Sequence, residues 1–364
     1  MALRQILVIN PGSTTTKIAV YENTKVIFLK SIPHSIEDLK NYKRVTDQYA
    51  FRKKVVLHEL KHAHIEINKI EVVVGRGGLL RPIKSGIYSI NDRMKKDLRE
   101  GILGEHASNL GGLIADNIAR SLPNAKAYIA DPVVVDEMEE VARIAGHPDF
   151  KRISIFHALN QKATARAYAR LLNSKYEDLN LIITHMGGGI SIGAHLRGRV
   201  IDVNNALDGE GPFSPERTGT LPVGQLIKKC FEEDMTIEQV KKMVTGEGGL
   251  MAYFGTNSAY QIELMALDGD LKARFIQDAM SYQVAKEIGA MATVLRGDVD
   301  AIILTGGIAN NPMVVEYIKK MVGYIAPVII YPGEDEMHAL AMNGLMVLKG
   351  EVIPKEYTEE NMVF

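Results

Sequence analysis

Short apolar runs alternate with longer amphipathic stretches along this chain, which predicts strands and helices in alternation. Runs of strand length occupy residues 3–30 (two or three strands), 71–74, 125–129, 181–184, 191–196, 199–203 and 301–304. Helical spacing of apolar residues occupies 46–65, 92–100, 106–121, 159–172, 222–232, 236–244 and 271–295. Each half of the chain therefore begins with hairpin strands and continues with strand and helix alternation, which indicates an α/β protein.

The length of 364 residues exceeds that of an average single domain. The polar segment NSKYEDLN around Ser174 separates the two halves, so we predict one domain at residues 1–173 and a second at 174–364. Each is expected to hold a mixed sheet flanked by helices, with a cleft between the two domains.

The first hairpin turns within NPGSTTTK, a segment rich in groups that bind anions. A glycine in the turn allows backbone N–H groups to approach a phosphate closely. Side chains that can also donate hydrogen bonds to an anion flank this glycine, namely those of Asn10, Ser13, Thr15 and Lys17. The segment is not a Walker A loop, because GxxxxGK[ST] is absent and the residues after Lys17 predict a strand rather than a helix.

A second glycine turn, HMGGG, joins the strands at 181–184 and 191–196. It carries His185 and three consecutive glycines, which leave bare backbone for a phosphate to lie against. These are Gly187, Gly188 and Gly189.

A third turn, GGIANNP, follows the strand at 301–304 with Gly306 and Gly307. Asn310 and Asn311 precede Pro312, and asparagine before proline is typical of a helix start. Helix N-termini attract phosphate. One such turn can be rich in glycine for packing alone, but three at strand ends favour nucleotide binding.

Net charge excludes some partners. The chain has 43 basic and 44 acidic residues, so its bulk electrostatics favour neither nucleic acid nor a membrane surface. No segment approaches 18 consecutive apolar residues, and the N-terminus lacks a signal-peptide pattern, so we expect a soluble cytoplasmic protein. Cys230 is the single cysteine, which excludes an internal disulfide and a multi-cysteine metal site.

Two arginines stand at positions in the sequence from which they could reach a phosphate-binding site. Arg76 stands at the end of an apolar strand, and Arg217 lies in GPFSPERTG, a loop too long for a simple connector. Permanently charged guanidinium groups from the two halves could clamp a phosphoryl group in transfer. Taken singly, each is more commonly a surface arginine.

Histidines and carboxylates complete the set of candidates. His106, His157 and His185 lie at a helix start or strand end and could donate to a phosphate oxygen, although a core histidine is an alternative for each. Asp131 ends a strand, where carboxylates often meet metal or substrate. Glu336 opens the last helix, where it would serve either as a partner of the helix dipole or as a ligand of Mg²⁺.

The motifs together resemble those of the acetate and butyrate kinase family, within the actin, heat-shock chaperone and sugar kinase superfamily. The resemblance runs almost end to end. VINPGSTTTK is similar to the family's first signature, and THMGGGISIG with GEGPFSPERTG is similar to its second. Acetate kinases tend to have Asn-Ala-Gly-Ser-Ser-Ser and His-Leu-Gly-Asn-Gly, and the departures from those patterns resemble the butyrate branch.

This resemblance implies two duplicated domains of the ribonuclease H-like, actin-like ATPase type and at least a dimer. It implies reversible transfer of the ATP γ-phosphoryl group to butyrate or a related short-chain fatty acid, with Mg²⁺. By position, Arg76, Arg217, His157 and Asp131 match catalytic residues, and Glu336 matches a magnesium-side carboxylate. The phosphate loop residues Asn10, Ser13 and Lys17 match the first motif, as His185 does the second.

Two positions depart from the acetate branch. Gly188 replaces an asparagine, so a nucleotide contact from that side chain is absent. Residues 255–260, GTNSAY, replace Ser-Ser-Asp-Phe-Arg, so no role is carried over there.

Three alternatives stay open at this point. One is an acetate or propionate kinase of the same family, and acyl-chain preference is not readable from sequence because one methylene changes affinity by only about 1–3 kcal/mol. Another is a sugar-type kinase that uses Asp131 as general base. The third is an ATP-gated binding protein without transfer activity.

Overall fold

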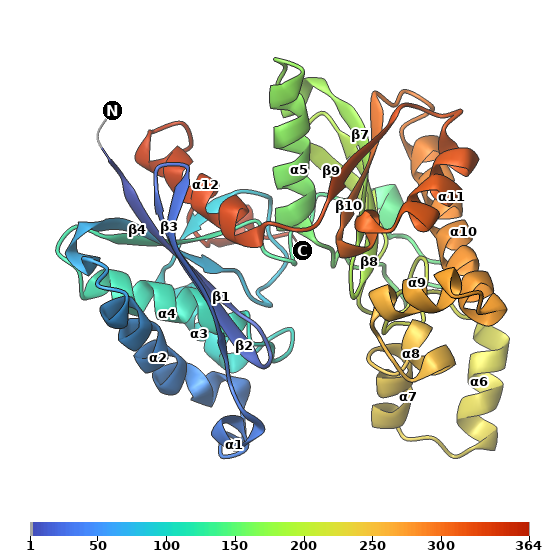
Figure 1. Cartoon of the computed structure of the whole chain (residues 1–364), viewed down its shortest axis with the longest axis horizontal. Coiled ribbons are helices and arrows are strands. Elements are labelled where there is room, and N and C mark those ends of the chain that lie inside the picture. Colours follow the sequence, from blue (N-terminus) through green and yellow to red (C-terminus); the bar gives the residue numbers. More distant parts are fainter. Residues whose placement is uncertain (1–2, 364) are drawn as a thin grey trace. The chain divides into compact units, whose positions relative to one another are not determined.

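The computed structural model describes residues 3–363, and the chain forms two compact units. The first combines the residues up to Asp136 with those from Asp335 onward, and the second spans Glu137–Glu334. The units do not follow the predicted boundary at residues 173/174, because a helix at 158–171 packs on the second sheet and the last helix packs on the first. Figure 1 shows the sheet and the helices of each unit.

The first unit contains a six-stranded sheet in the order β3-β2-β1-β4-β6-β5. Its strands are β1 (Gln5–Pro11), β2 (Thr15–Glu22), β3 (Lys25–Pro33), β4 (Ile70–Arg76), β5 (Ile87–Ser89) and β6 (Lys126–Ala130). β1, β2 and β3 form an antiparallel meander, while β4 runs parallel to β1 and β6 parallel to β4. The short β5 is antiparallel to β6.

Helices cover both faces of this sheet. The helices of the first unit are α1 (Ile36–Leu39), α2 (Tyr49–His62), α3 (Asp92–Glu100), α4 (Asn109–Arg120) and α12 (Glu336–Leu348). A Cβ on Gly75 of β4 would collide with the backbone of Gly111 in α4, so α4 lies directly on the sheet. Gly344 of α12 instead faces the side chains of Val72 and Val74. Because successive strand residues point to opposite faces, α4 and α12 lie on opposite sides.

The second unit contains a five-stranded sheet in the order β11-β10-β7-β8-β9. Its strands are β7 (Asn180–Met186), β8 (Ile190–Leu196), β9 (Arg199–Val203), β10 (Ala301–Gly306) and β11 (Val328–Pro332). Again the first three form an antiparallel meander, and β10 and β11 continue in parallel from β7. The two units therefore repeat one strand order and direction, with β5 as an addition in the first.

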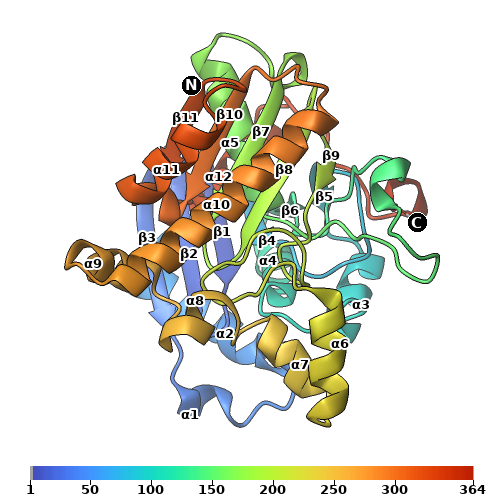
Figure 2. The ribbon, with the colours of Figure 1, turned by 90° about the vertical axis from the view of Figure 1, so that its right-hand side faces the viewer.

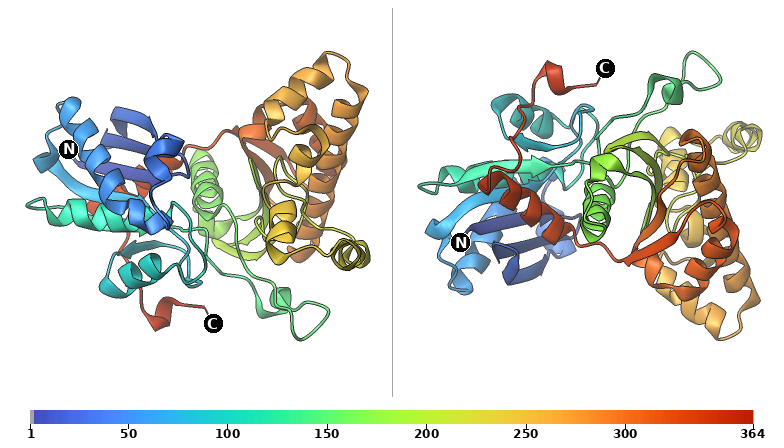
Figure 3. Two further views of the ribbon diagram at one scale, coloured as in Figure 1. Left: turned by 90° about the horizontal axis from the view of Figure 1, so that it is seen from below. Right: turned by 90° about the horizontal axis from the view of Figure 1, so that it is seen from above.

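The second unit has helices on both faces of its sheet and further helices that lie away from it (Figure 1). They are α5 (Ala158–Leu171), α6 (Val223–Glu232), α7 (Ile237–Val244), α8 (Gly249–Phe254), α9 (Ala259–Leu267), α10 (Leu271–Val294) and α11 (Pro312–Val322). Leu181 and Ile183 of β7 pack with α5, whereas Ile182 packs with α10 and α11. Figure 2 shows α10 crossing the strands, and Figure 3 shows α5 in green and α10 in orange on the two sides of the sheet.

The mixed α/β class with helices on both faces confirms the prediction. Most predicted elements are present within a few residues of their expected ends, and α3 and β9 have the predicted bounds. Asn311 caps α11, since its side-chain oxygen accepts from the N–H groups of Met313 and Val314 with Pro312 inside the helix. Short elements such as β5 and α8 were not predicted.

Candidate active site

The carboxyl edge of the first sheet gathers three predicted residues. Asn10 ends β1 beside Arg76 at the end of β4, and Glu336 opens α12 above the same face. The Arg76 guanidinium contacts both carboxylate oxygens of Glu336, at 3.0 and 3.1 Å, and the Asn10 amide donates to that carboxylate at 2.6 Å. Arg76 also donates to Asn10 Oδ1 at 3.3 Å. A cation and a carboxylate thus lie side by side at one strand edge.

Lys17 lies on β2 rather than in the turn itself. It pairs with Asn10 across the antiparallel ladder, so its side chain points to the same face as that of Asn10. The Lys17 side chain is exposed, as are Ser13 and Thr14 at the turn. This arrangement leaves the polar groups of the turn accessible to a ligand.

Asp131 follows β6, one residue beyond the strand partner of Arg76. Its backbone has φ of +36°, which is strained for a residue with a side chain. The buried carboxylate accepts from Ser85 Oγ at 2.7 Å and from the Gly86 N–H at 2.8 Å. The strain is therefore held in place by a defined set of hydrogen bonds, as is common at functional sites.

His106 precedes α4 and does not belong to the helix, whose N-cap is Ser108. Its ring nitrogen Nδ1 accepts from the Ser108 N–H at 3.2 Å and lies 2.8 Å from Ser108 Oγ. The substrate-side role predicted for His106 stays a prediction.

The second glycine turn lies between β7 and β8, under the loop at residues 204–219. Ser214 Oγ donates to the Gly188 carbonyl at 2.7 Å. A Cβ on Gly189 would collide with the Arg217 guanidinium, whereas a Cβ on Gly188 would lie 3.6 Å from Glu216. A side chain at position 189 would therefore displace the Arg217 guanidinium, whereas Gly188 has room for one.

The Arg217 side chain is largely buried. Its Nη1 donates to the Ala206 carbonyl at 2.5 Å, and Glu216 lies 3.9 Å from Nη2. Burial lowers the pKa of Arg217, and the nearby Glu216 carboxylate opposes that shift. Among the described residues, Nε of Arg217 has no hydrogen-bond partner. A buried guanidinium with an unused donor is suited to binding an anion.

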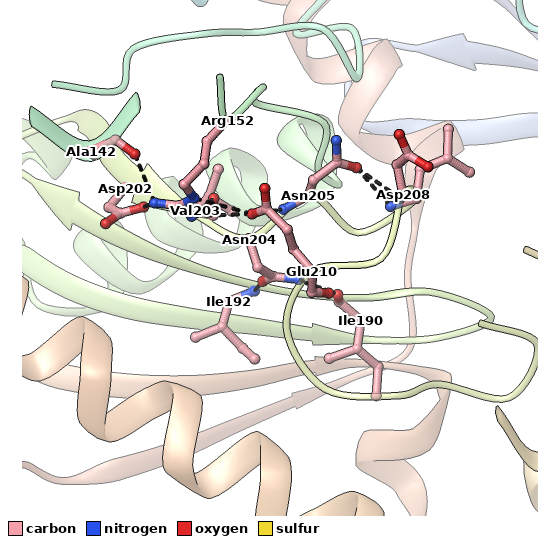
Figure 4. Close-up of polar contacts among 11 residues, drawn as sticks. Ala142, Arg152, Ile190, Ile192, Asp202, Val203, Asn204, Asn205, Asp208 and Glu210 are labelled. Atoms are coloured by element: carbon pink, nitrogen blue, oxygen red, sulfur yellow. Dashed lines mark hydrogen bonds and ion pairs between the residues drawn. The ribbon is translucent and has the colours of Figure 1, made fainter. Parts of the chain in front are cut away.

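A polar network anchors the loop that carries Arg217 (Figure 4). Arg152 donates to Asp202 at 3.0 Å and to Glu210 at 3.2 Å, and also to the Val203 carbonyl at 3.0 Å. Glu210 accepts in addition from the Asn205 N–H at 3.1 Å. The loop base is thereby tied to β9, which limits where its tip can move.

His157 and His185 stack face to face, with ring centroids 3.8 Å apart and planes 17° from parallel. His157 is the N-cap of α5, and its Nδ1 lies 2.9 Å from Ser191 Oγ. His185 ends β7, with Nδ1 2.8 Å from Asn160 and Nε2 3.4 Å from Glu334. The structure thus brings together two histidines predicted separately.

A buried chain of hydrogen bonds continues behind His157. Gln161 donates through Nε2 to Ser191 Oγ at 2.9 Å and faces His195 Nε2 with Oε1 at 2.9 Å. His195 Nδ1 lies 2.6 Å from the Tyr176 hydroxyl. Burial holds the pKa of His195 well below its usual value, so this ring is neutral and donates from Nε2 while accepting at Nδ1. Ser191 Oγ, which accepts from Gln161, lies 2.9 Å from His157 Nδ1, so a hydroxyl proton donated to Nδ1 would leave the ring proton of a neutral His157 on Nε2.

The third glycine turn contributes to a pocket within the second unit. Gly306 has φ of +88°, and a Cβ there would collide with the Met186 backbone, so only glycine fits. The pocket has a volume of about 360 Å³, within the range of small-molecule sites. It is lined by residues of four segments, namely Gly187, Gly188, Pro215, Asn257, Ser258, Ala259, Tyr260, Glu263, Gly307, Ile308, Asn310 and Asn311.

The pocket includes residues that the sequence did not identify. Asn257, Ser258 and Glu263 line it, and Asn257 donates to Glu216 beside Arg217 at 3.1 Å. Burial raises the pKa of Glu263. No local motif marks these positions, because they reach the pocket only through packing of the segment 255–263 beside two glycine turns.

The predicted residues therefore form two groups. Asn10, Lys17, Arg76, Asp131 and Glu336 share the strand edge of the first unit. The second group belongs to the second unit and comprises His157, His185, Gly187, Gly188, Gly189, Arg217, Gly306, Gly307 and Asn310. Their convergence on one ligand stays a prediction.

Two features are absent from the part of the chain that the structure describes, residues 3–363. No helix combines the length and apolar character needed to cross a membrane. In the same part of the chain, no group of three or more His, Cys, Asp or Glu side chains is placed to hold a metal ion.

Comparison with known proteins gives likenesses of sequence and of fold. The sequence profile of the acetokinase family matches residues 151–325. Over 353 residues the chain is 56% identical to Butyrate kinase 1 and 55% identical to Butyrate kinase 2 of Clostridium acetobutylicum, with 97% of this chain and 99% of each relative covered.

Two solved structures share the fold. The acetate kinase of Porphyromonas gingivalis matches with a TM-score of 0.78 and 18% identity over 95% of this chain and 100% of that chain. A propionate kinase from Francisella tularensis matches with a TM-score of 0.72 and 18% identity over 94% and 99%. These likenesses confirm the predicted fold class.

Proposed function

Because the chain belongs to the acetokinase family, we propose that it acts as a butyrate kinase, which transfers the γ-phosphoryl group of ATP reversibly to butyrate or a related short-chain fatty acid. The products are butanoyl phosphate and ADP. The observation that carries the proposal is the likeness of nearly the whole chain to two butyrate kinases. The anion-binding features of both units support it.

The pocket of the second unit suits the nucleoside of ATP. Its volume and mixed lining fit a base and a ribose, and Gly187, Gly188 and Gly307 lie at its edge with exposed backbone. The glycine turn then leads toward Gly189 and Arg217 for the phosphates. In the first unit, the turn with Ser13, Thr15 and the neighbouring Lys17 supplies donors of the same kind.

Phosphoryl transfer to a carboxylate has one main requirement, which is neutralisation of charge. A fatty carboxylate has a pKa near that of glutamate and is ionised at neutral pH, so it needs no general base. Arg76, Arg217 and the Nε2–H of His157 are the donors proposed to face the equatorial oxygens of a planar, metaphosphate-like group. Positioning and electrostatic stabilisation account for catalysis of this kind.

Mg²⁺ belongs to the proposal as the ion that accompanies ATP. It is typically held by one or two carboxylates together with substrate phosphates, and Glu336 at the strand edge fits that donor set. In the structure Arg76 neutralises Glu336, so a bound ion would compete for the same carboxylate. The ion supplies charge neutralisation for the phosphates, while Asn10 orients the carboxylate.

The geometry of Asp131 argues against a sugar-type kinase. A hydroxyl acceptor requires a carboxylate base, whereas Oδ1 of Asp131 is engaged as the acceptor for Ser85 Oγ and the Gly86 N–H of its own unit. We propose instead that Asp131 positions the strand edge near the reacting groups. A cytoplasmic location and a homo-oligomer of at least two chains are part of the same proposal, on the family resemblance alone.

A hydroxamate assay tests the proposal. The purified protein is incubated with MgATP, hydroxylamine and one acid from the series acetate, propionate, butyrate, isobutyrate and valerate. We expect acyl hydroxamate, with the highest kcat/KM for a four-carbon acid. Highest kcat/KM with acetate or propionate would indicate a different acyl kinase of the family. ATP binding without hydroxamate from any acid would refute the proposal and indicate a sugar-type kinase or an ATP-gated binding protein.

A further inference from the structure

Arg52 in α2 is fully buried, and its guanidinium lies beneath the turn between β1 and β2. Nη1 donates to the carbonyls of Gly12 at 2.7 Å and Thr15 at 2.9 Å, and Nη2 donates to the Ser13 carbonyl at 2.8 Å. Nη1 also lies 3.1 Å from Thr16 Oγ1. One side chain thus gathers three backbone carbonyls of a five-residue turn.

These bonds fix the direction of the backbone N–H groups. In a planar trans peptide, the carbonyl of one residue and the N–H of the next point in opposite directions. The Gly12 and Ser13 carbonyls point toward Arg52, so the N–H groups of Ser13 and Thr14 point away from it. Both residues are exposed, and neither N–H donates within the described chain. Two consecutive outward N–H groups form an anion-binding concavity.

The positive charge of Arg52 has no acidic partner. Among the described residues no carboxylate lies within ion-pair distance of its guanidinium, whose acceptors are carbonyls, the Thr16 hydroxyl and the Gln48 amide. Burial lowers the pKa of Arg52 to about 10, which still leaves the group charged at pH 7. An uncompensated charge in a protein interior is costly unless a ligand of opposite sign balances it.

We propose that Arg52 is a positioning residue for phosphate binding, which shapes the β1–β2 turn into a nest for a phosphate and supplies a buried positive charge behind it. Arg52 does not touch the anion. It acts through the peptide units of residues 12–14, whose N–H groups do.

The planar guanidinium is suited to this task in a way that lysine is not. Five N–H donors in a fixed fork can serve several acceptors at once, whereas an ammonium has three donors and no plane. His34 supports the same arrangement, since its N–H donates to the Thr14 carbonyl at 2.8 Å and its Nε2 lies 2.8 Å from Thr16 Oγ1. All four carbonyls from Gly12 to Thr15 therefore accept from groups within the protein.

The size of the effect follows from distance. A phosphate oxygen bound to the Ser13 N–H would lie about 8 Å from the guanidinium, given one hydrogen bond on each side of a peptide unit. At an effective dielectric constant of about 20, a unit charge at that distance changes the affinity for a single negative charge by roughly 30-fold. Disordering of the turn would add to this loss.

The inference rests on the proposed function, and its test separates the two. Affinities of the full-length protein for ATP and for adenosine are measured by calorimetry for wild type, Arg52→Met, Arg52→Lys and the control Arg44→Gln. Arg44 also donates to two backbone carbonyls, those of Arg99 and Glu100, but at an exposed position. Its loss should leave both affinities unchanged.

We expect Arg52→Met to weaken ATP binding by 30-fold or more and adenosine binding by less than threefold, because adenosine has no phosphate. Arg52→Lys should weaken ATP binding about tenfold, since lysine keeps the positive charge but not the planar set of N–H donors. If Arg52→Met does not fold by circular dichroism, Arg52→Lys alone decides. ATP affinity within threefold of the Arg44→Gln control, or equal losses for ATP and adenosine, would overturn the inference. Absence of hydroxamate with wild type that binds ATP would refute only the proposed function.

Discussion

Replacement of Gly189 by alanine places a methyl group where the Arg217 guanidinium lies. The guanidinium has to swing away, and its hydrogen bond to the Ala206 carbonyl breaks. Loss of an arginine that stabilises a transferring phosphoryl group costs on the order of 10³-fold in rate, which is about 4 kcal/mol at 1.36 kcal/mol per tenfold. We therefore expect Gly189→Ala to lower kcat for hydroxamate formation by about 10²–10³. Overpacking should lower stability by about 1–3 kcal/mol, a few degrees in Tm.

Substitution of the neighbouring glycine and a double variant show whether displacement of Arg217 causes the loss of kcat. A methyl group on Gly188 meets Glu216 at 3.6 Å, an ordinary contact, so Gly188→Ala should lose at least tenfold less in kcat. If Gly189→Ala acts by displacing Arg217, adding it to Arg217→Ala should cost little more, because the interaction is already gone. Multiplication of the two losses in the double variant, or kcat of Gly189→Ala within threefold of wild type, would refute this reasoning.

Three further substitutions probe other parts of the structure. Ser191→Ala removes the hydroxyl that fixes the His157 tautomer, so kcat should fall about tenfold with KM for ATP nearly unchanged in steady-state assays. Below pH 6.5 the His195 ring takes up a proton in the unfolded chain but not in the folded protein, so the free energy of unfolding should fall by about 1.4 kcal/mol per pH unit. His195→Gln should abolish this loss, as measured by denaturant unfolding at several pH values. Asp131→Asn should lower kcat without altering the acidic side of the pH–rate profile, whereas a shifted limb would indicate a hydroxyl acceptor.

Periodicity and run length predicted the long elements well, including α6 and α7, which contain no fully buried residue, and β7 and β10, which are buried on both faces. β9 and α3 have the predicted bounds, and the cap at Asn311 was readable from its asparagine and proline. The short strand β5 was missed because three residues carry no period. The composition of the two compact units could not be predicted either, because α12 packs on the first sheet although it follows the whole second unit in the sequence.

Candidate site residues could be proposed from the sequence only where several polar residues or glycines follow one another in a short segment. The glycine turns and Arg217 stand in distinctive segments, and in the structure a Cβ at position 189 would collide with the Arg217 guanidinium. Arg52 and Gln161 could not be found in this way. Each lies inside an ordinary helical pattern, and its importance arises from contacts with turns or strands more than 25 residues away.

The two turns proposed to bind an anion are built differently, although the strands that they connect correspond in the two sheets. In the first unit the β1–β2 turn keeps its side chains, and Arg52 pulls its carbonyls inward from below. In the second unit the β7–β8 turn consists of glycines, and Ser214 of the covering loop donates a hydrogen bond to the Gly188 carbonyl. The β1–β2 turn is held by a side chain packed beneath it, which directs its N–H groups outward. The glycines of the β7–β8 turn have no side chains to pack, so this turn is held by a residue of the loop that covers it. The first turn should thus depend on a buried arginine and the second on its covering loop, although both connect equivalent strands.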